Sequence, residues 1–154
     1  MKLKTREIPL VRFRHVLPEF LGPGGDCYLE VDARAGGAIN SAWMAATEQL
    51  ALRARIMDRK VNEVKDPDAF VRQDHSNRLA VVKETFGVIY DTCVLEWRTN
   101  IVDGDAPLTT TRANFLELTE QRIPELAEAF AALKKAVMEA GAAVVEDDKG
   151  IIKN

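Results

Sequence analysis

The sequence is poor in the residues from which metal sites and nucleophilic centres are built, with two cysteines and two histidines among 154 residues. Cys27 and Cys93 lack the paired short spacings of structural zinc sites and form no disulfide framework, which suits a reducing cytoplasm. His75 could serve Cys93 as a base, but along one helix about 27 Å would separate them, at ~1.5 Å per residue. We therefore expect no metal, no cofactor and no enzymatic activity.

Two further absences bear on membranes and nucleic acid. No uninterrupted apolar run approaches the ~18–20 residues of a membrane span, and Pro9, Arg12 and His15 interrupt the N-terminal stretch, so we expect no signal peptide. Lysine and arginine total 21 against 24 acidic residues, a net charge of −3 that gives no general attraction for phosphate backbones. The basic run from Arg53 to Lys60 is interleaved with acidic residues. We expect neither membrane nor nucleic acid as a partner.

What the sequence does have is enough apolar content for one sizeable core. Hydrophobic residues make up 47% of a chain whose length suits a single domain. We place that domain over residues 1–145. Residues 146–154 have too little apolar content to fold alone, and we expect a mobile tail there.

The N-terminal part predicts a β-hairpin over residues 8–34. Apolar and polar residues alternate in 10–17 and again in 27–33, which favours two strands. The intervening run from Pro18 to Gly25 is rich in proline and glycine and predicts a long turn. Because two strands are marginally stable alone, this pair must pack on other elements.

The middle of the chain predicts a long helical hairpin over residues 40–99. Asn40 or Ser41 can cap the first helix, and Asp66-Pro67 can cap and start the second. The short connection folds the helices into an antiparallel pair. The apolar stripe of the first helix comprises Trp43, Ala46, Leu50, Ala54, Met57, Val61 and Val64, and that of the second Phe70, Leu79, Val82, Phe86, Ile89, Cys93 and Trp97.

The remaining chain predicts a turn-rich loop over 100–111 and two helices over 112–141. Asp103-Gly-Asp105 lacks the ligand ladder of a calcium loop, so we interpret it as a solvated turn. Thr110 or Thr111 caps the first helix, and Pro124 starts the last, which ends near Gly141. The predicted fold is mainly α: a bundle of about four helices with a small N-terminal antiparallel β-hairpin, at the margin of α+β.

The segment from Thr92 to Val137 resembles the tail assembly chaperones of long-tailed phages. In that family a tryptophan that closes a helix precedes an Asp/Gly/Pro turn, a Thr or Ser helix start, a short Phe/Leu helix and a final helix begun by proline. This sequence matches the pattern at Trp97, Asp103-Gly104, Pro107, Thr111, Phe115, Leu118 and Pro124.

The resemblance implies a protein without an active site. Its relatives coat the tape measure protein in the host cytoplasm before the tail tube polymerises, and leave before the virion matures. The major tail tube protein is a second expected partner, while the oligomeric state, including self-association, stays open. The rival interpretation is a permanent virion component, such as a head–tail connector or tail completion protein. The predicted partner-binding residues are Trp97, Ile101, Leu108 and Phe115. For Trp97, core and contact roles weigh about equally.

Overall fold

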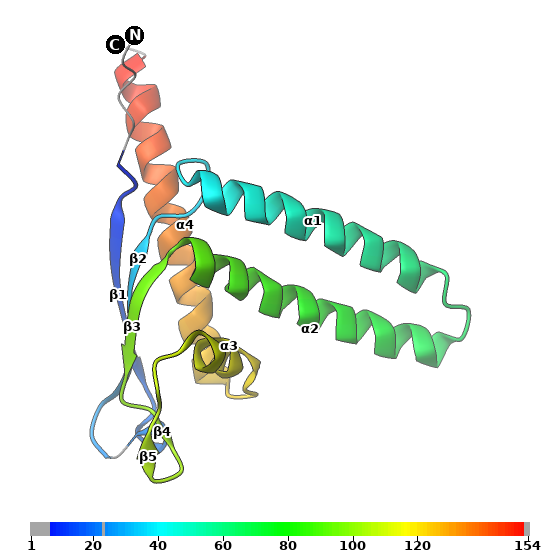
Figure 1. Ribbon diagram of the computed structural model, residues 1–154, viewed down its shortest axis with the longest axis horizontal. Coiled ribbons are helices and arrows are strands. Elements are labelled where there is room, and N and C mark those ends of the chain that lie inside the picture. The colour runs from blue at the N-terminus through cyan, green and yellow to red at the C-terminus, as the bar shows by residue number, and fades with distance from the viewer. Residues whose placement is uncertain (1–6, 23, 153–154) are drawn as a thin grey trace.

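The computed structural model describes residues 7–22 and 24–152, with side chains described as far as residue 144 (Figure 1). Across these residues the chain forms four α-helices, one short 3-10 helix, a three-stranded antiparallel sheet and a minor two-stranded hairpin. The fold is therefore mixed α+β and mainly helical.

The sheet has the order β1-β2-β3, with β1 spanning Leu10–Leu17, β2 Cys27–Arg34 and β3 Val94–Thr99. The predicted hairpin is confirmed as β1 and β2, and a 3-10 helix, η1 (Glu19–Leu21), lies in the turn between them. The third strand is a correction, because we expected a helix through residue 99. β3 pairs with β2 and places Trp97 opposite Val31. It gives the hairpin the third strand that stability requires.

Helices α1 (Ser41–Asn62) and α2 (Pro67–Thr92) form the predicted antiparallel pair, and we call it the arm. Figure 1 shows the arm projecting sideways from the sheet, with the α1–α2 loop at its far end. Leu50 and Val61 of α1 are buried in the arm. Asn40 caps α1 as predicted, because its side-chain oxygen accepts a 3.1 Å hydrogen bond from the backbone N–H of Trp43.

Helices α3 (Arg112–Glu120) and α4 (Pro124–Ile152) complete the fold. Thr111 caps α3 by accepting a 3.1 Å hydrogen bond from the backbone N–H of Asn114, as predicted. The predicted stripe of α4 is buried, but against the sheet and α3 rather than in a bundle of four helices, and its Phe130 also meets Phe86 of α2. In Figure 1, α4 runs alongside the sheet while the arm leaves it at a steep angle. The stripe consists of Leu126, Phe130, Leu133 and Val137.

Helix α4 continues past Gly141, where we expected it to end. A Cβ atom at this position would overlap the carbonyl oxygen of Gly36, in the loop after β2. The backbone N–H of Gly36 also donates a 2.9 Å hydrogen bond to the carbonyl of Val137. The glycine thus permits close approach of two backbones, which a glycine can do inside a helix. The tail expected over 146–154 is helical as far as Ile152, and residues 153–154 lie outside the described residues.

Candidate protein-binding surfaces

Two of the four predicted partner-binding residues lie in the core. Trp97 is 2% exposed and Phe115 is fully buried. Their rings meet edge to face with centroids 5.5 Å apart, and Phe115 meets Phe130 at 5.1 Å. Such aromatic contacts join β3, α3 and α4. The two side chains therefore hold elements together and present no surface to a partner in this conformation.

The indole of Trp97 is buried without a polar partner. Within the described part of the chain, no hydrogen-bond acceptor meets its Nε1 atom. Burying an N–H group without an acceptor costs about 1–3 kcal/mol. Burial of the large apolar ring, together with its edge-to-face contact with Phe115, offsets this cost.

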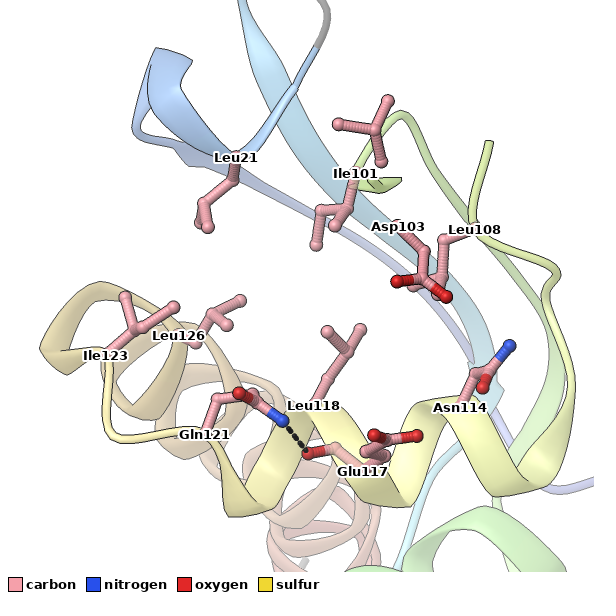
Figure 2. Close-up of a pocket in the computed structure, with 11 residues that line it drawn as sticks. Leu21, Ile101, Asp103, Leu108, Asn114, Glu117, Leu118, Gln121, Ile123 and Leu126 are labelled. Carbon is pink, nitrogen blue, oxygen red and sulfur yellow. Dashed lines mark hydrogen bonds between the residues drawn. The ribbon is translucent and has the colours of Figure 1, made fainter. Parts of the chain in front are cut away.

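The other two predicted residues, Ile101 and Leu108, line an open cleft of about 280 Å³, here called the corner cleft. Figure 2 shows that their side chains point into the same space as those of Leu118 and Leu126. Ile101 is 5% exposed and Leu108 is half-buried. The walls come from η1, the loop after β3, α3 and the start of α4. The full lining is Leu21, Ile101, Val102, Asp103, Leu108, Asn114, Glu117, Leu118, Gln121, Ile123 and Leu126.

A small β-hairpin brings Ile101 and Leu108 together. Strands β4 (Val102–Asp103) and β5 (Ala106–Pro107) pair, and the backbone N–H of Leu108 donates to the carbonyl of Ile101 at 3.1 Å. Gly104 in the turn has φ +65°, which glycine adopts without strain. The turn predicted at Asp103-Gly104 is therefore confirmed.

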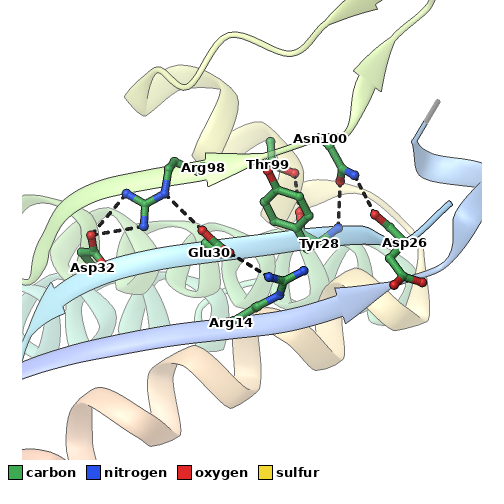
Figure 3. Close-up of polar contacts among 8 residues, drawn as sticks. All are labelled: Arg14, Asp26, Tyr28, Glu30, Asp32, Arg98, Thr99 and Asn100. Atoms are coloured by element: carbon green, nitrogen blue, oxygen red, sulfur yellow. Dashed lines mark hydrogen bonds and ion pairs between the residues drawn. The ribbon is translucent and has the colours of Figure 1, made fainter. Parts of the chain in front are cut away.

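Polar contacts on the outer face of the sheet hold the segment that leads to Ile101 (Figure 3). The Asn100 side chain donates to the carbonyl of Asp26 at 2.7 Å and accepts from the N–H of Tyr28 at 2.8 Å. Arg98 bonds Glu30 at 3.1 Å and Asp32 at 3.2 Å, and these carboxylates raise the pKa of its guanidinium. These bonds join the end of β3 to β2 beside the corner cleft.

The chemistry of the corner cleft suits an apolar side chain accompanied by a positive charge. Its floor is apolar, whereas Asp103 and Glu117 are exposed carboxylates of its lining. In Figure 2 both carboxylates stand beside Asn114 at one side of the opening. Ligand pockets usually measure about 300–1,000 Å³, so the cleft is small for an organic ligand and better matched to one or two protein side chains.

Comparison with known proteins adds no family. No family model, curated protein or solved structure matches this chain.

A second surface lies on α2. Leu79 and Val82 belong to the stripe that we expected to be buried, yet they are 55% and 49% exposed. The correction has a geometric cause, since α3 and α4 reach only the C-terminal half of α2, where Phe86 and Ile89 are buried. Farther out, α2 turns Asn77 toward α1 and leaves Leu79 open.

The two cysteines are poor nucleophiles in this structure. Burial raises the pKa of the Cys27 thiol and of the Cys93 thiol, which lowers the thiolate fraction at neutral pH. Over the residues that the structure describes, no three His, Cys, Asp or Glu side chains gather as a metal site would require. Nor does any described helix have the length and apolar content to cross a membrane.

Proposed function

We propose that this protein is a non-enzymatic tail assembly chaperone, which binds the tape measure protein and keeps it soluble during tail morphogenesis. The observation that carries the proposal is the origin of the corner cleft. The segment from Thr92 to Val137, which resembles that family, supplies every lining residue except Leu21. Of the residues that carry the resemblance, Asp103 and Leu118 line this cleft themselves, and the segment around them supplies its apolar floor.

The physical properties of the cleft fit reversible binding. A long apolar helix aggregates when bare, and insertion of its side chains into a cleft removes them from water. Because association costs translational and rotational freedom, a cleft of about 280 Å³ gives modest affinity on its own. Modest affinity permits release when the tail tube forms around the tape measure protein.

Co-expression with the tape measure protein of the same phage tests the proposal. We expect the tape measure protein to stay soluble and to co-purify with the tagged chain. Leu108→Asp puts a charge into the cleft and should reduce recovery about tenfold, equivalent to about 1.4 kcal/mol. Leu95→Asp is the matched control, because Leu95 is 51% exposed on β3 and lies outside the cleft lining. Equal recovery with both variants would remove the cleft from the interaction.

A charge variant at an exposed residue tests the cleft without disturbing the buried core. Glu117 is exposed at the cleft, so Glu117→Lys should weaken co-purification, whereas Glu128→Lys on the exposed side of α4 should not.

Mass spectrometry of purified virions separates the proposal from the rival function, a permanent part of the particle. The proposal expects the chain to be absent from mature particles, and a stoichiometric amount there would identify a structural tail component instead.

A further inference from the structure

The exposed part of α2 borders a groove on the opposite side of α3 from the corner cleft. Two adjoining hollows, of about 710 and 320 Å³, share Val82 and Thr119 and together form this groove, here called the α2 groove. One hollow lies between α2 and the α3–α4 connection, and the other continues between α2, α3 and α4. Along α2 the groove runs from His75 to Phe86, about 16 Å at ~1.5 Å per residue.

The floor of the α2 groove is apolar and shallow. Leu79 and Val82 project from α2, and Phe86 lies at the inner end. On the α4 side the lining residues Ala127 and Ala131 are small and exposed. Small side chains let another backbone approach closely, and three turns of apolar floor match the i, i+3, i+4, i+7 anchors of an amphipathic helix.

The rim of the α2 groove is basic, although the whole chain has a formal net charge of −3. The groove lining contains three basic side chains and one carboxylate: Lys83, Arg122 and Lys134, and Glu120. The Nζ atom of Lys83 lies 2.8 Å from Oε1 of Glu120, so these two neutralise each other. Arg122 and Lys134 then leave the rim positive, whereas Asp103 and Glu117 make the corner cleft negative.

We propose that the α2 groove is a second docking site, which binds an acidic amphipathic helix of a partner protein. The apolar face of that helix covers Leu79 and Val82, and its flanking carboxylates face Arg122 and Lys134. The α2 groove shares only Gln121 with the lining of the corner cleft and has the opposite charge preference, so this proposal does not depend on the tape measure protein as a partner. Its apolar floor distinguishes it from a phosphate-binding surface.

A synthetic helix provides the direct probe. We would label a peptide of about 15 residues with fluorescein, place leucines on one face and glutamates on both flanks, and measure its binding to the full chain by fluorescence anisotropy. A second peptide has the same leucines and lysine flanks. The proposal expects the acidic peptide to bind at least tenfold more tightly than the basic one, with the difference reduced at high salt.

Matched variants locate the binding. We expect each of two variants, Leu79→Asp and Lys134→Glu, to lower the affinity for the acidic peptide about tenfold. Leu52→Asp, at a residue 50% exposed on α1, and Lys135→Glu, one residue along α4, should leave it unchanged. No binding, equal binding of both peptides, or equal effects of variants and controls would overturn the proposal. Leu108→Asp should not affect this peptide, so failure here is distinguishable from failure of the tape measure interaction.

Discussion

At the scale of single residues, Asn40 ties the arm to the rest of the molecule. Its side chain is 2% exposed and caps α1, and its Nδ2 atom also donates to the carbonyls of Ala35 at 3.1 Å and Thr92 at 3.0 Å. These partners lie after β2, at the start of α1 and at the end of α2. One carboxamide thus fixes the start of α1 and the end of α2, the two helix ends at the base of the arm, beside the sheet.

Replacement of Asn40 by alanine should lower the free energy of unfolding by about 2–4 kcal/mol, because a helix cap is lost and buried carbonyls lose their donor. Urea denaturation followed by circular dichroism measures the change. Ser41→Ala, at the exposed neighbouring position, should cost less than about 0.5 kcal/mol. A loss for Asn40→Ala no larger than that of the control would contradict the clamp.

Phe115 offers a second test, since the sequence suggested a contact role and the structure buries the ring among Tyr90, Trp97 and Phe130. Phe115→Ala should cost about 3–5 kcal/mol of stability, as is usual for a large ring in a core. Phe20→Ala, at a ring 70% exposed, is the control and should cost little. A stable Phe115→Ala variant that no longer binds its partner would restore the contact role.

At the scale of elements, two helix glycines have opposite environments. A Cβ atom added to Gly141 would overlap the backbone of Gly36. A Cβ atom added to Gly87 in α2 would have ordinary contact distances, with Nη2 of Arg112 nearest at 3.4 Å. Glycine costs a helix about 1 kcal/mol relative to alanine. The same substitution should therefore act in opposite directions at the two sites.

Thermal denaturation of both alanine variants measures this difference. Gly87→Ala should leave the melting temperature unchanged or raise it, because helix propensity improves and no backbone must move. Gly141→Ala should lower it by several degrees, because α4 must move away from the loop after β2. Equal shifts for the two variants would show that the approach of α4 to Gly36 is not a tight contact.

The sequence predicted those elements whose signals are local. Pro67, Thr111 and Pro124 mark helix starts as expected, since caps and first-turn prolines act within a few residues. β3 was missed because Cys93 and Trp97 fit the helical spacing of α2. The free edge of β2, about 65 residues earlier in the chain, decides the outcome, and no local pattern reports it.

The two candidate binding surfaces were likewise predicted only where the signal is local. The sequence placed Ile101 and Leu108 among the contact residues, and the structure puts both in the corner cleft. It could not show that Leu79 and Val82 stay exposed, since periodicity gives the apolar face of a helix but not how far its neighbours extend along it. Likewise, the sequence alone could not separate a buried Trp97 from an exposed one.

At the scale of the whole molecule, α3 separates two surfaces of opposite charge. The corner cleft on one side carries Asp103 and Glu117, and the α2 groove on the other carries Arg122 and Lys134. Arg112 at the start of α3 bonds Asp91 of α2 at 2.7 and 2.9 Å, which holds α3 between them. If both proposals hold, the chain engages two segments at once, and simultaneous engagement raises the effective affinity of two modest sites.

The central claim is that this chain shields the tape measure protein from aggregation. Light scattering after dilution of denatured tape measure protein measures this directly, with the chain or an equal mass of serum albumin in the buffer. We predict that the chain holds scattering near the baseline at roughly equimolar ratio and that Leu108→Asp does so less well. Scattering that rises as fast with the chain as with albumin would contradict the account.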